Sequence, residues 1–485
     1  MTQRRLRLAL LMLLGMVGAC TMAPQRGPIT APELARCQQT FKDNDALLRA
    51  AQIHDAQATR VKGHAFLRVD RLLVSIAAEV KNTAQRQAWL ARAMAMDADC
   101  RGLELARLSP APDSAVVEQL QNCRAKLGAA LRDDDKAWHS MLDVAQVADD
   151  YSATLRVLGV YPISARIVLA GVAGLQAREM PRLLDPPTGD SPAARRYRLG
   201  SDATDAALPA ASGPWHRDAL GIPLLGDAEL AALLRRHAPE LSVDIRSDDD
   251  HLGQVTHKRA PFVDSANPVL YTQLAYTRFG RQVLPQLVYT WWFAARTARG
   301  PFDPLAGPLD GLSWRVTLDD DGQPLAYDLV HNCGCYHMFF PSPRLRMRHL
   351  ASTLAEPAWV PFTIPTHWRG RLHLALASGS HYLRAIAPAG ASPPDHFYAL
   401  RPYRELRALP AREQRVSLFD AHGLVPASAR GERWFLWPMG IVAPGSMRQW
   451  GHQATAFVGR RHFDDARLFE RYFERVDSAA VAAPD

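Results

Sequence analysis

The spacing of apolar residues changes once along this chain, and the change predicts two kinds of structure. From residue 32 to about residue 180, apolar residues recur every three or four positions, which is the period of a helix with one buried face. After residue 225 the period becomes two, as in a strand with one buried face. The clearest helical stripes are Trp89, Ala93, Met96 and Cys100, and Val116, Leu120, Cys123 and Leu127.

Two β-hairpins are predicted in the second part of the chain. Residues 314–318 alternate in polarity, Asp319-Asp320-Asp321-Gly322 supplies a turn, and residues 325–329 alternate again. Residues 270–279 and 283–293 flank Gly280 in the same way. A further strand is predicted at 372–376, with helices at 226–236 and 464–476. We therefore expect an α+β fold, in which a helical N-terminal domain precedes a mostly antiparallel β-rich domain with a C-terminal helix.

Proline, glycine and alanine are concentrated in residues 181–224, which predicts a linker or a long surface loop. This segment separates a helical domain at 32–180 from an α+β domain at 225–485. With 48% hydrophobic and 22% charged residues, the chain has an ordinary globular composition. Its 485 residues are enough for two or three domains.

Residues 1–20 combine the features of an export signal. Three arginines precede an uncharged apolar run, residues 8–17, which is too short to cross a bilayer. The run ends in small residues directly before Cys20, in the order Val17-Gly18-Ala19-Cys20. This arrangement resembles the signal peptide and lipobox of bacterial lipoproteins. A secretory signal with a chance cysteine, or an uncleaved anchor, is the alternative.

The resemblance implies a membrane anchor and a location. In that family a lipid is attached to the thiol that corresponds to Cys20, and cleavage removes the residues before it. Residues 1–19 would then be the signal peptide and residues 20–31 a tether. Thr21, in place of an aspartate, implies the periplasmic face of the outer membrane. Removing residues 1–19 lowers the net charge from +8 to +5, and no dense basic stripe remains, so we expect no nucleic-acid partner.

The segment His331-Asn332-Cys333-Gly334-Cys335-Tyr336-His337 is the densest cluster of reactive side chains. If the strand before it continued in phase, His331, Cys333, Cys335 and His337 would all point to the core-facing side. A straight strand would hold them too far apart for one ion, but a bend at Gly334 would bring two or three together. Additional ligands, chosen by residue type only, would be His251, His257, His381 and His452.

Three chemical interpretations of this segment remain open. The thiols and imidazoles would bind a soft or borderline ion such as Zn or Cu. Alternatively, Cys333 and Cys335 form structural disulfides, which are the default in an oxidising compartment. In the third interpretation, one cysteine is a thiolate nucleophile activated by a neighbouring histidine. The spacing matches no zinc-finger pattern, so the sequence does not decide between them.

The remaining cysteines and two short motifs give weaker predictions. Cys100 and Cys123 lie on the apolar stripes of neighbouring helices, so they are a possible disulfide; the alternative is two buried thiols. Residues 248–251, with His257, would offer oxygen and nitrogen ligands, although a charged loop explains them equally simply. Residues 378–381 place serines beside a histidine, as acyl transfer requires, but neighbouring residues rarely adopt the geometry of a catalytic triad.

The expected function follows from the anchor more than from any site. Standard ATP, dinucleotide and zinc-protease motifs are absent from the sequence. Aromatic clusters at 291–293 and 336–340 would stack on sugars or pack in the core. We therefore expect a periplasm-facing outer-membrane lipoprotein, a binding or structural component of the envelope with a protein or glycan ligand. The alternative is a metal- or thiol-dependent enzyme whose site is the 331–337 segment.

Overall fold

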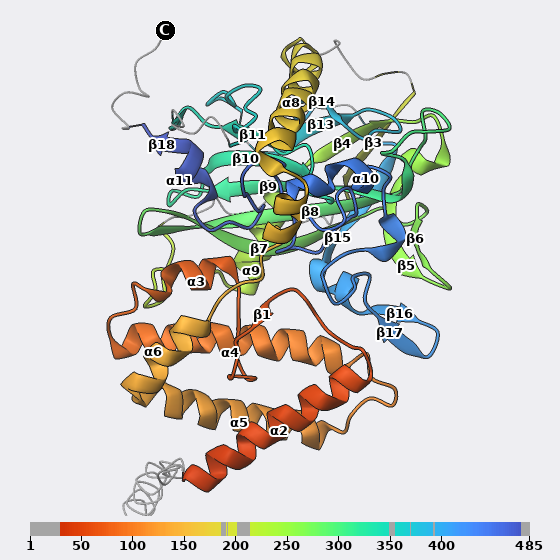
Figure 1. Ribbon diagram of the computed structural model, residues 1–485. Coiled ribbons are helices and arrows are strands. Elements are labelled where there is room, and N and C mark those ends of the chain that lie inside the picture. Colours follow the sequence, from red (N-terminus) through yellow and green to blue (C-terminus); the bar gives the residue numbers. More distant parts are fainter. Residues whose placement is uncertain are drawn as a thin grey trace, which may run out of the picture.

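The computed structural model describes residues 30–185, 191, 193–200, 214–348, 355–368, 370–390 and 393–476. A helical region lies below a β-rich region that contains a large curled sheet (Figure 1). The predicted α+β fold, with the helical part first, is therefore confirmed. The predicted signal peptide, Cys20 and nearly all of the tether lie outside the described residues. Among the helices of the described residues, none combines the length and the apolar character that a membrane span requires.

The hydrophobic core of the helical region is formed mainly by residues between Cys37 and Ala145, and Leu220, Ile222, Val283 and Ala466 from the later part of the chain also contribute to it. Each of three helices begins at a side chain that accepts a backbone N–H: Asp70, Asn82 and Asp113. Trp89 and Trp138 pack edge to face in the core, with ring centroids 5.4 Å apart. The elements are α2 (Ala31–Ala50), β1 (Thr59–Arg60), β2 (Arg68–Val69), α3 (Arg71–Ala77), α4 (Thr83–Leu105), α5 (Ser114–Asp133) and α6 (Asp135–Val144).

A disulfide in the helical region corrects one prediction. Cys37 of α2 is bonded to Cys123 of α5, whereas Cys100 of α4 is a buried free thiol. The predicted Cys100–Cys123 bridge is therefore wrong. Both cysteines lie on buried helix faces, as their spacing indicated. However, the face of α5 that carries Cys123 packs on α2, and the Sγ of Cys100 accepts a hydrogen bond from Arg407 (3.1 Å).

The β-rich region is built on a sheet of twelve strands. Both predicted hairpins are present, with Tyr327 opposite Val316 in one and Phe279 opposite Gln282 in the other. Most neighbouring strands of the sheet are antiparallel, but β15 is parallel to β7 and β3, and β13 is parallel to β4, so the sheet is mixed and the prediction of a mostly antiparallel domain holds only in part. The main strands are β3 (Ala194–Leu199), β4 (Glu240–Asp244), β5 (Leu252–His257), β6 (Pro261–Asp264), β7 (Val269–Phe279), β8 (Gln282–Arg296), β9 (Gly307–Leu318), β10 (Pro324–His331), β11 (Met338–Pro341), β13 (Leu372–Leu376), β14 (Leu383–Pro388) and β15 (His396–Pro402).

Two elements do not follow the predicted division into a helical domain at 32–180 and a linker at 181–224. Helix α8 (Tyr161–Leu184) runs along the β-rich region, and its residues Leu175, Met180 and Leu183 pack on the core of the large sheet (Figure 1). Strand β3 lies inside the predicted linker 181–224, yet it pairs with β15 and β4. The linker prediction is wrong for β3, because the prolines and alanines on either side of this short strand are typical of a loop.

The remaining elements are short and lie around the sheet. The predicted C-terminal helix is only five residues long, because the chain continues from it directly into a strand that pairs with β12. Helix α9 confirms the helix predicted at 226–236 within one residue. These elements are α7 (Ala153–Leu158), α9 (Asp227–Arg236), η2 (Asp248–Asp250), β12 (Leu345–Met347), η3 (Tyr403–Arg407), β16 (Leu409–Ala411), β17 (Gln414–Val416), η4 (Pro426–Ser428), α10 (Arg433–Leu436), η5 (Trp437–Met439), α11 (Leu468–Tyr472) and β18 (Phe473–Arg475).

Candidate functional site

The segment 331–337 is a tight turn between β10 and β11. The backbone N–H of His331 donates to the carbonyl of Cys335 (3.0 Å), and Gly334 donates back to the carbonyl of His331 (2.7 Å). Gly334 has a φ of 96°, and a Cβ there would lie 2.3 Å from the carbonyl oxygen of Ala454. The turn therefore requires glycine at this position, and the strand does not continue in phase as the sequence suggested.

The turn sends the two histidines to opposite faces of the sheet. His337 bonds through Nε2 to Asp328 (2.8 Å) and packs on Phe463. His331 lies instead on the other face, edge to face with the stacked rings of Tyr336 and Tyr382, at 5.6 and 5.5 Å between ring centroids. The predicted site of His331, Cys333, Cys335 and His337 around one Zn or Cu ion is therefore wrong. Among the described residues, no group of three or more His, Cys, Asp and Glu side chains is placed to hold a metal ion.

His331 is the inner end of a buried chain of alternating carboxylates and imidazoles. Nδ1 of His331 lies 3.8 Å from Oδ1 of Asp310, on β9. The other carboxylate oxygen of Asp310 bonds to Nδ1 of His381 (2.7 Å), in the turn between β13 and β14. Nε2 of His381 then lies 3.3 Å from Oδ1 of Asp250, at the end of η2. Four residues from four separate segments thus form one chain, and each is at most 2% exposed.

Burial and pairing act in opposite directions on these four groups. Burial alone would raise the pKa of Asp310 and Asp250, but their interactions with the imidazoles lower both pKa values, that of Asp310 strongly. Burial lowers the pKa of His331, and its interaction with Asp310 compensates only in part. For His381, the two carboxylates outweigh burial and raise the pKa. His331 is accordingly a neutral imidazole at pH 7, whereas His381 holds its proton between two negative charges.

In the described residues, the carboxylate–imidazole chain leaves several polar atoms without a hydrogen-bond partner, which is unusual for buried polar groups. Within the described residues, Nε2 of His331, Oδ1 of Asp310 and the hydroxyl of Tyr336 have no hydrogen-bond partner. The backbone is also strained here: Leu309, Tyr336 and His381 are three of the seven described non-glycine residues with positive φ. Unsatisfied polar atoms and strained backbone tend to be retained at functional sites.

A cleft of about 810 Å³ opens at the outer end of the chain. Asp250, Ser380 and Tyr382 line it, together with Glu179 and Arg182 from the last turns of α8. Within the described residues, neither the hydroxyl of Ser378 nor that of Ser380 hydrogen-bonds to the His381 imidazole, which has a carboxylate on each side. The serine–histidine interpretation of residues 378–381 therefore has no geometric support, and His381 belongs to the carboxylate–imidazole chain.

The charges that line the cleft are not balanced. Glu179 pairs with Arg182, Asp244 with Arg384, and Asp250 with His381. Arg246 and Arg299 also line the cleft, and both are exposed. Within the described residues neither guanidinium forms an ion pair, although the charge of Arg299 contributes to lowering the pKa of Asp303, which does not line the cleft; the lining groups therefore carry an excess of positive charge.

The turn at 331–337 also carries two thiols. Cys333 and Cys335 are both unbridged, which leaves the disulfide interpretation without support, and the N–H of Cys335 points at Sγ of Cys333 (3.4 Å). The neighbouring Cys333 thiol and burial raise the pKa of Cys335 well above its ordinary value. Sγ of Cys335 also lies 3.9 Å from Oε1 of Glu432, and burial raises the pKa of Glu432 to about 7. Cys335 is therefore a protonated thiol at neutral pH and not a ready nucleophile.

The other histidines that the sequence proposed as ligands lie elsewhere. His251 bonds to the hydroxyl of Tyr197 (3.0 Å), His257 ends β5, and His452 bonds to Asp150 (3.0 Å) in a separate cluster. Of the four, only His381 reaches the neighbourhood of His331. The aromatic residues 291–293 are fully buried in β8, where Phe293 stacks on His381 at 3.8 Å between ring centroids.

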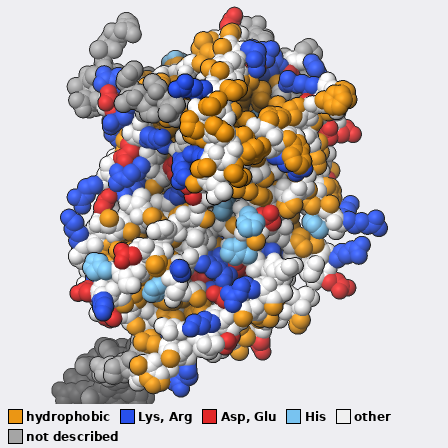
Figure 2. Space-filling model, in the orientation of Figure 1, with side chains coloured by type: hydrophobic (Ala, Val, Ile, Leu, Met, Phe, Trp, Pro, Cys, Tyr) orange, Lys and Arg blue, Asp and Glu red, His pale blue; other side chains and the backbone are white. Residues whose placement is uncertain are grey.

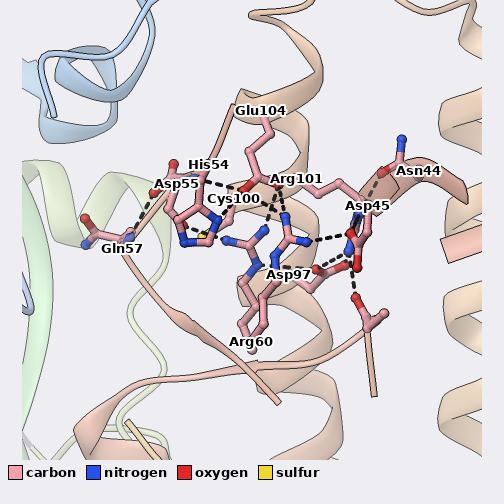
Figure 3. Close-up of polar contacts among 12 residues, drawn as sticks. Asn44, Asp45, His54, Asp55, Gln57, Arg60, Asp97, Cys100, Arg101 and Glu104 are labelled. Atoms are coloured by element: carbon pink, nitrogen blue, oxygen red, sulfur yellow. Dashed lines mark hydrogen bonds and ion pairs between the residues drawn. The ribbon is translucent and has the colours of Figure 1, made fainter. Parts of the chain in front are cut away.

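A second buried polar cluster lies in the helical region (Figure 3). Glu104 accepts hydrogen bonds from Arg60 (2.8 Å) and from Arg68 (2.7 Å). Asp97 pairs with Arg101 (3.0 Å), which also pairs with Asp45 (2.7 Å). Sequence reasoning named His331 and His381 as possible ligands, but it predicted neither cluster, because the members of each come from distant segments of the chain. The charges of this second cluster are all paired, so it is a structural network.

Comparisons with family models, curated proteins and solved structures found no match for this chain. The functional argument therefore rests on the residues themselves.

Proposed function

We propose that this chain is a lipid-anchored protein of the bacterial cell envelope that binds a small anionic ligand in the cleft beside β14. The observation that carries the ligand class is the charge balance of the cleft. Each lining carboxylate has a positive partner, whereas Arg246 and Arg299 form no ion pair with a carboxylate within the described residues. Guanidinium groups recognise carboxylates and phosphates through paired N–H donors, so an anion is the ligand that they favour.

The carboxylate–imidazole chain supports a binding site at this position. A large pocket whose floor contains convergent polar groups with shifted pKa values is the default location of a ligand site. The raised pKa of His381 favours its protonated form, which offsets part of the negative charge of Asp250 and Asp310 beneath the cleft. The positive charge that the cleft offers to a ligand therefore comes from the two guanidinium groups at its rim.

The binding proposal is tested by calorimetric titration with inorganic phosphate and with citrate. The chain from Thr21 to Asp485, which contains every described element, should bind at least one of them. Replacing both free arginines (Arg246→Ala, Arg299→Ala) should weaken binding by about tenfold or more. The matched control removes two exposed arginines elsewhere (Arg36→Ala, Arg49→Ala) and should leave binding unchanged. Equal binding by the two double variants, or none by the parent chain, would contradict an anion site.

The envelope location is supported by the resemblance of residues 1–20 to a lipoprotein signal. Its test is separate from that of the cleft. The Cys20→Ser chain should leave the membrane fraction when it is produced in a bacterium that processes lipoproteins, whereas Cys100→Ser should stay in that fraction. Normal anchoring of the Cys20→Ser chain would refute the lipid anchor.

Thiol chemistry at Cys333 and Cys335 is a second candidate function, favoured by the proximity of two unbridged thiols. Alkylation of the native protein with iodoacetamide, followed by peptide mass mapping, tests it. A thiol-dependent site requires that one of the two reacts faster than the buried Cys100. Protection of both to the same degree as Cys100 would remove this candidate.

A further inference from the structure

The molecule exposes a large apolar surface that its own fold does not cover. Its main members are Val157, Ile163, Ile167, Trp434, Phe435 and Trp437, and we call this set the apolar surface. Four of these side chains are strongly exposed: Val157 by 78%, Trp434 by 72%, Ile167 by 71% and Ile163 by 63%. Single exposed apolar residues are ordinary, but a contiguous group of this size marks an interaction site.

The apolar surface is contiguous although it comes from two distant parts of the chain. Helices α7 and α8 and the α10 segment all contact η5. Gly159 packs directly on Pro438, and the N–H of Ser152 donates to the carbonyl of Gly440 (2.7 Å). Figure 2 shows hydrophobic side chains gathered over α8 and α10 on one face of the molecule. Only Ala165 and Leu183 of the 24 residues of α8 are fully buried: one side of the helix packs on η5 and the large sheet, whereas the side that carries Ile163 and Ile167 is exposed.

The charges around the apolar surface are of one sign. Residues 151–178, which include α7 and most of α8, contain arginines but no aspartate or glutamate, and the same is true of residues 433–463. Arg166, Arg178 and Arg433 are exposed. Within the described residues, none of the three has a carboxylate partner. The guanidinium carbon of Arg433 lies over the ring of Trp434, 4.7 Å from the ring centroid.

We propose that the apolar surface docks on a bilayer that contains anionic phospholipids. Tryptophan and phenylalanine favour the boundary between acyl chains and headgroups, aliphatic side chains enter the acyl region, and arginines attract anionic headgroups. The choice of a bilayer over a protein partner rests on the proposed lipid anchor, which keeps a membrane beside the chain at high effective concentration. Because α8 also lines the cleft through Glu179 and Arg182, docking would hold the cleft near the membrane.

Vesicle co-sedimentation tests this proposal without the anchor. The chain from Thr21 to Asp485 lacks the lipidated cysteine, so any binding comes from the folded surface. It should sediment with vesicles of phosphatidylethanolamine and phosphatidylglycerol, and less with phosphatidylcholine alone. The triple variant Val157→Glu, Ile167→Glu and Trp434→Glu should bind at least about tenfold more weakly. All three positions are highly exposed, so the fold should persist, which circular dichroism checks.

The matched control adds the same charge at exposed apolar positions elsewhere. Leu47, Leu224 and Phe397 are 51%, 52% and 59% exposed, and their triple replacement by glutamate should leave vesicle binding unchanged. No vesicle binding by the parent chain, or an equal loss in both triple variants, would overturn the proposal. It would also be overturned if sedimentation velocity found a dimer that only the first triple variant disrupts while vesicle binding persists. None of these outcomes affects the Cys20→Ser test, so failure of the surface and failure of the anchor are distinguishable.

Discussion

The helical and β-rich regions each contain a buried polar cluster, and the two clusters differ in how completely they are paired. In the helical region, Glu104 and Asp97 each contact more than one guanidinium group. In the β-rich region, Asp310 is shared by two imidazoles, and Nε2 of His331 has no hydrogen-bond partner within the described residues. Both clusters are almost completely buried, so burial alone does not distinguish them.

How completely the charges are paired indicates which of the two clusters stabilises the fold. Arginine stays charged at any pH that a protein meets, so a buried arginine requires a carboxylate partner and cannot release it cheaply. Histidine can lose its charge, so it tolerates a buried site without a full set of partners. The helical cluster therefore stabilises the fold, whereas the carboxylate–imidazole chain contains titratable imidazoles and, within the described residues, polar atoms without a hydrogen-bond partner.

The largest expected effect comes from breaking the helical cluster. Glu104→Gln removes the charge that faces Arg60 and Arg68, and Arg68 is completely buried. We expect a loss of about 3–5 kcal/mol in the free energy of unfolding, measured by urea denaturation. Glu118→Gln on the exposed face of α5 is the control and should change it by less than about 0.5 kcal/mol. A cost below about 1 kcal/mol for Glu104→Gln would remove the contrast between the clusters.

A pH-dependent effect is expected from Glu432, beside the turn of β10. Its pKa is raised to about 7 in the folded protein by burial. Between about pH 4.5 and pH 7 the unfolded chain therefore ionises this group while the folded protein does not. Stability should fall over that window by about 3 kcal/mol through this group, and the fall should be complete above pH 7. Glu432→Gln should remove this slope, as urea denaturation at pH 5 and pH 8 would show; an unchanged slope would contradict the raised pKa.

The local pattern predicted most of the fold because local periodicity reports which face of an element is buried. Helices α4 and α5 and the hairpins of β7–β8 and β9–β10 have strong periods and clear turn residues. Strand β3 was missed because it is short and surrounded by loop-forming residues. Parallel pairing of β15 with β7 depends on contacts between residues far apart in the chain, which the sequence pattern does not report.

The site was predicted only in part, for the same reason. The 331–337 segment was singled out correctly as the place where reactive groups gather. Its partners Asp310, His381 and Asp250 come from other segments, and only the fold brings them to His331. The phase argument failed at Gly334, whose positive φ reverses the chain and sends His337 to the other face. A glycine between two cysteines was the one local signal of that turn.

A smaller effect, on the pKa of His381, should distinguish the two imidazoles of the carboxylate–imidazole chain. Asp310→Asn removes one of the two negative charges that raise the pKa of His381. We expect that pKa to fall by about one unit or more, followed by the side-chain nitrogen signals of His381 in an NMR pH titration. Asp248→Asn, at an exposed position of η2, is the control for long-range charge. If both variants left the pKa of His381 in place, Asp310 would not be its main partner.

The smallest effect on stability is expected at His331 itself. His331→Phe preserves an aromatic ring beside Tyr336 and Tyr382, removes no hydrogen bond from Nε2, and loses only the long contact of Nδ1 with Asp310 (3.8 Å). We expect the free energy of unfolding to change by at most about 1 kcal/mol. His337→Phe is the matched control, since it is equally buried but bonds to Asp328, and we expect it to cost about 1–3 kcal/mol. If His331→Phe were the more costly of the two, His331 would be a structural residue, and the contrast between the paired and the unsatisfied cluster would not hold within the β-rich region.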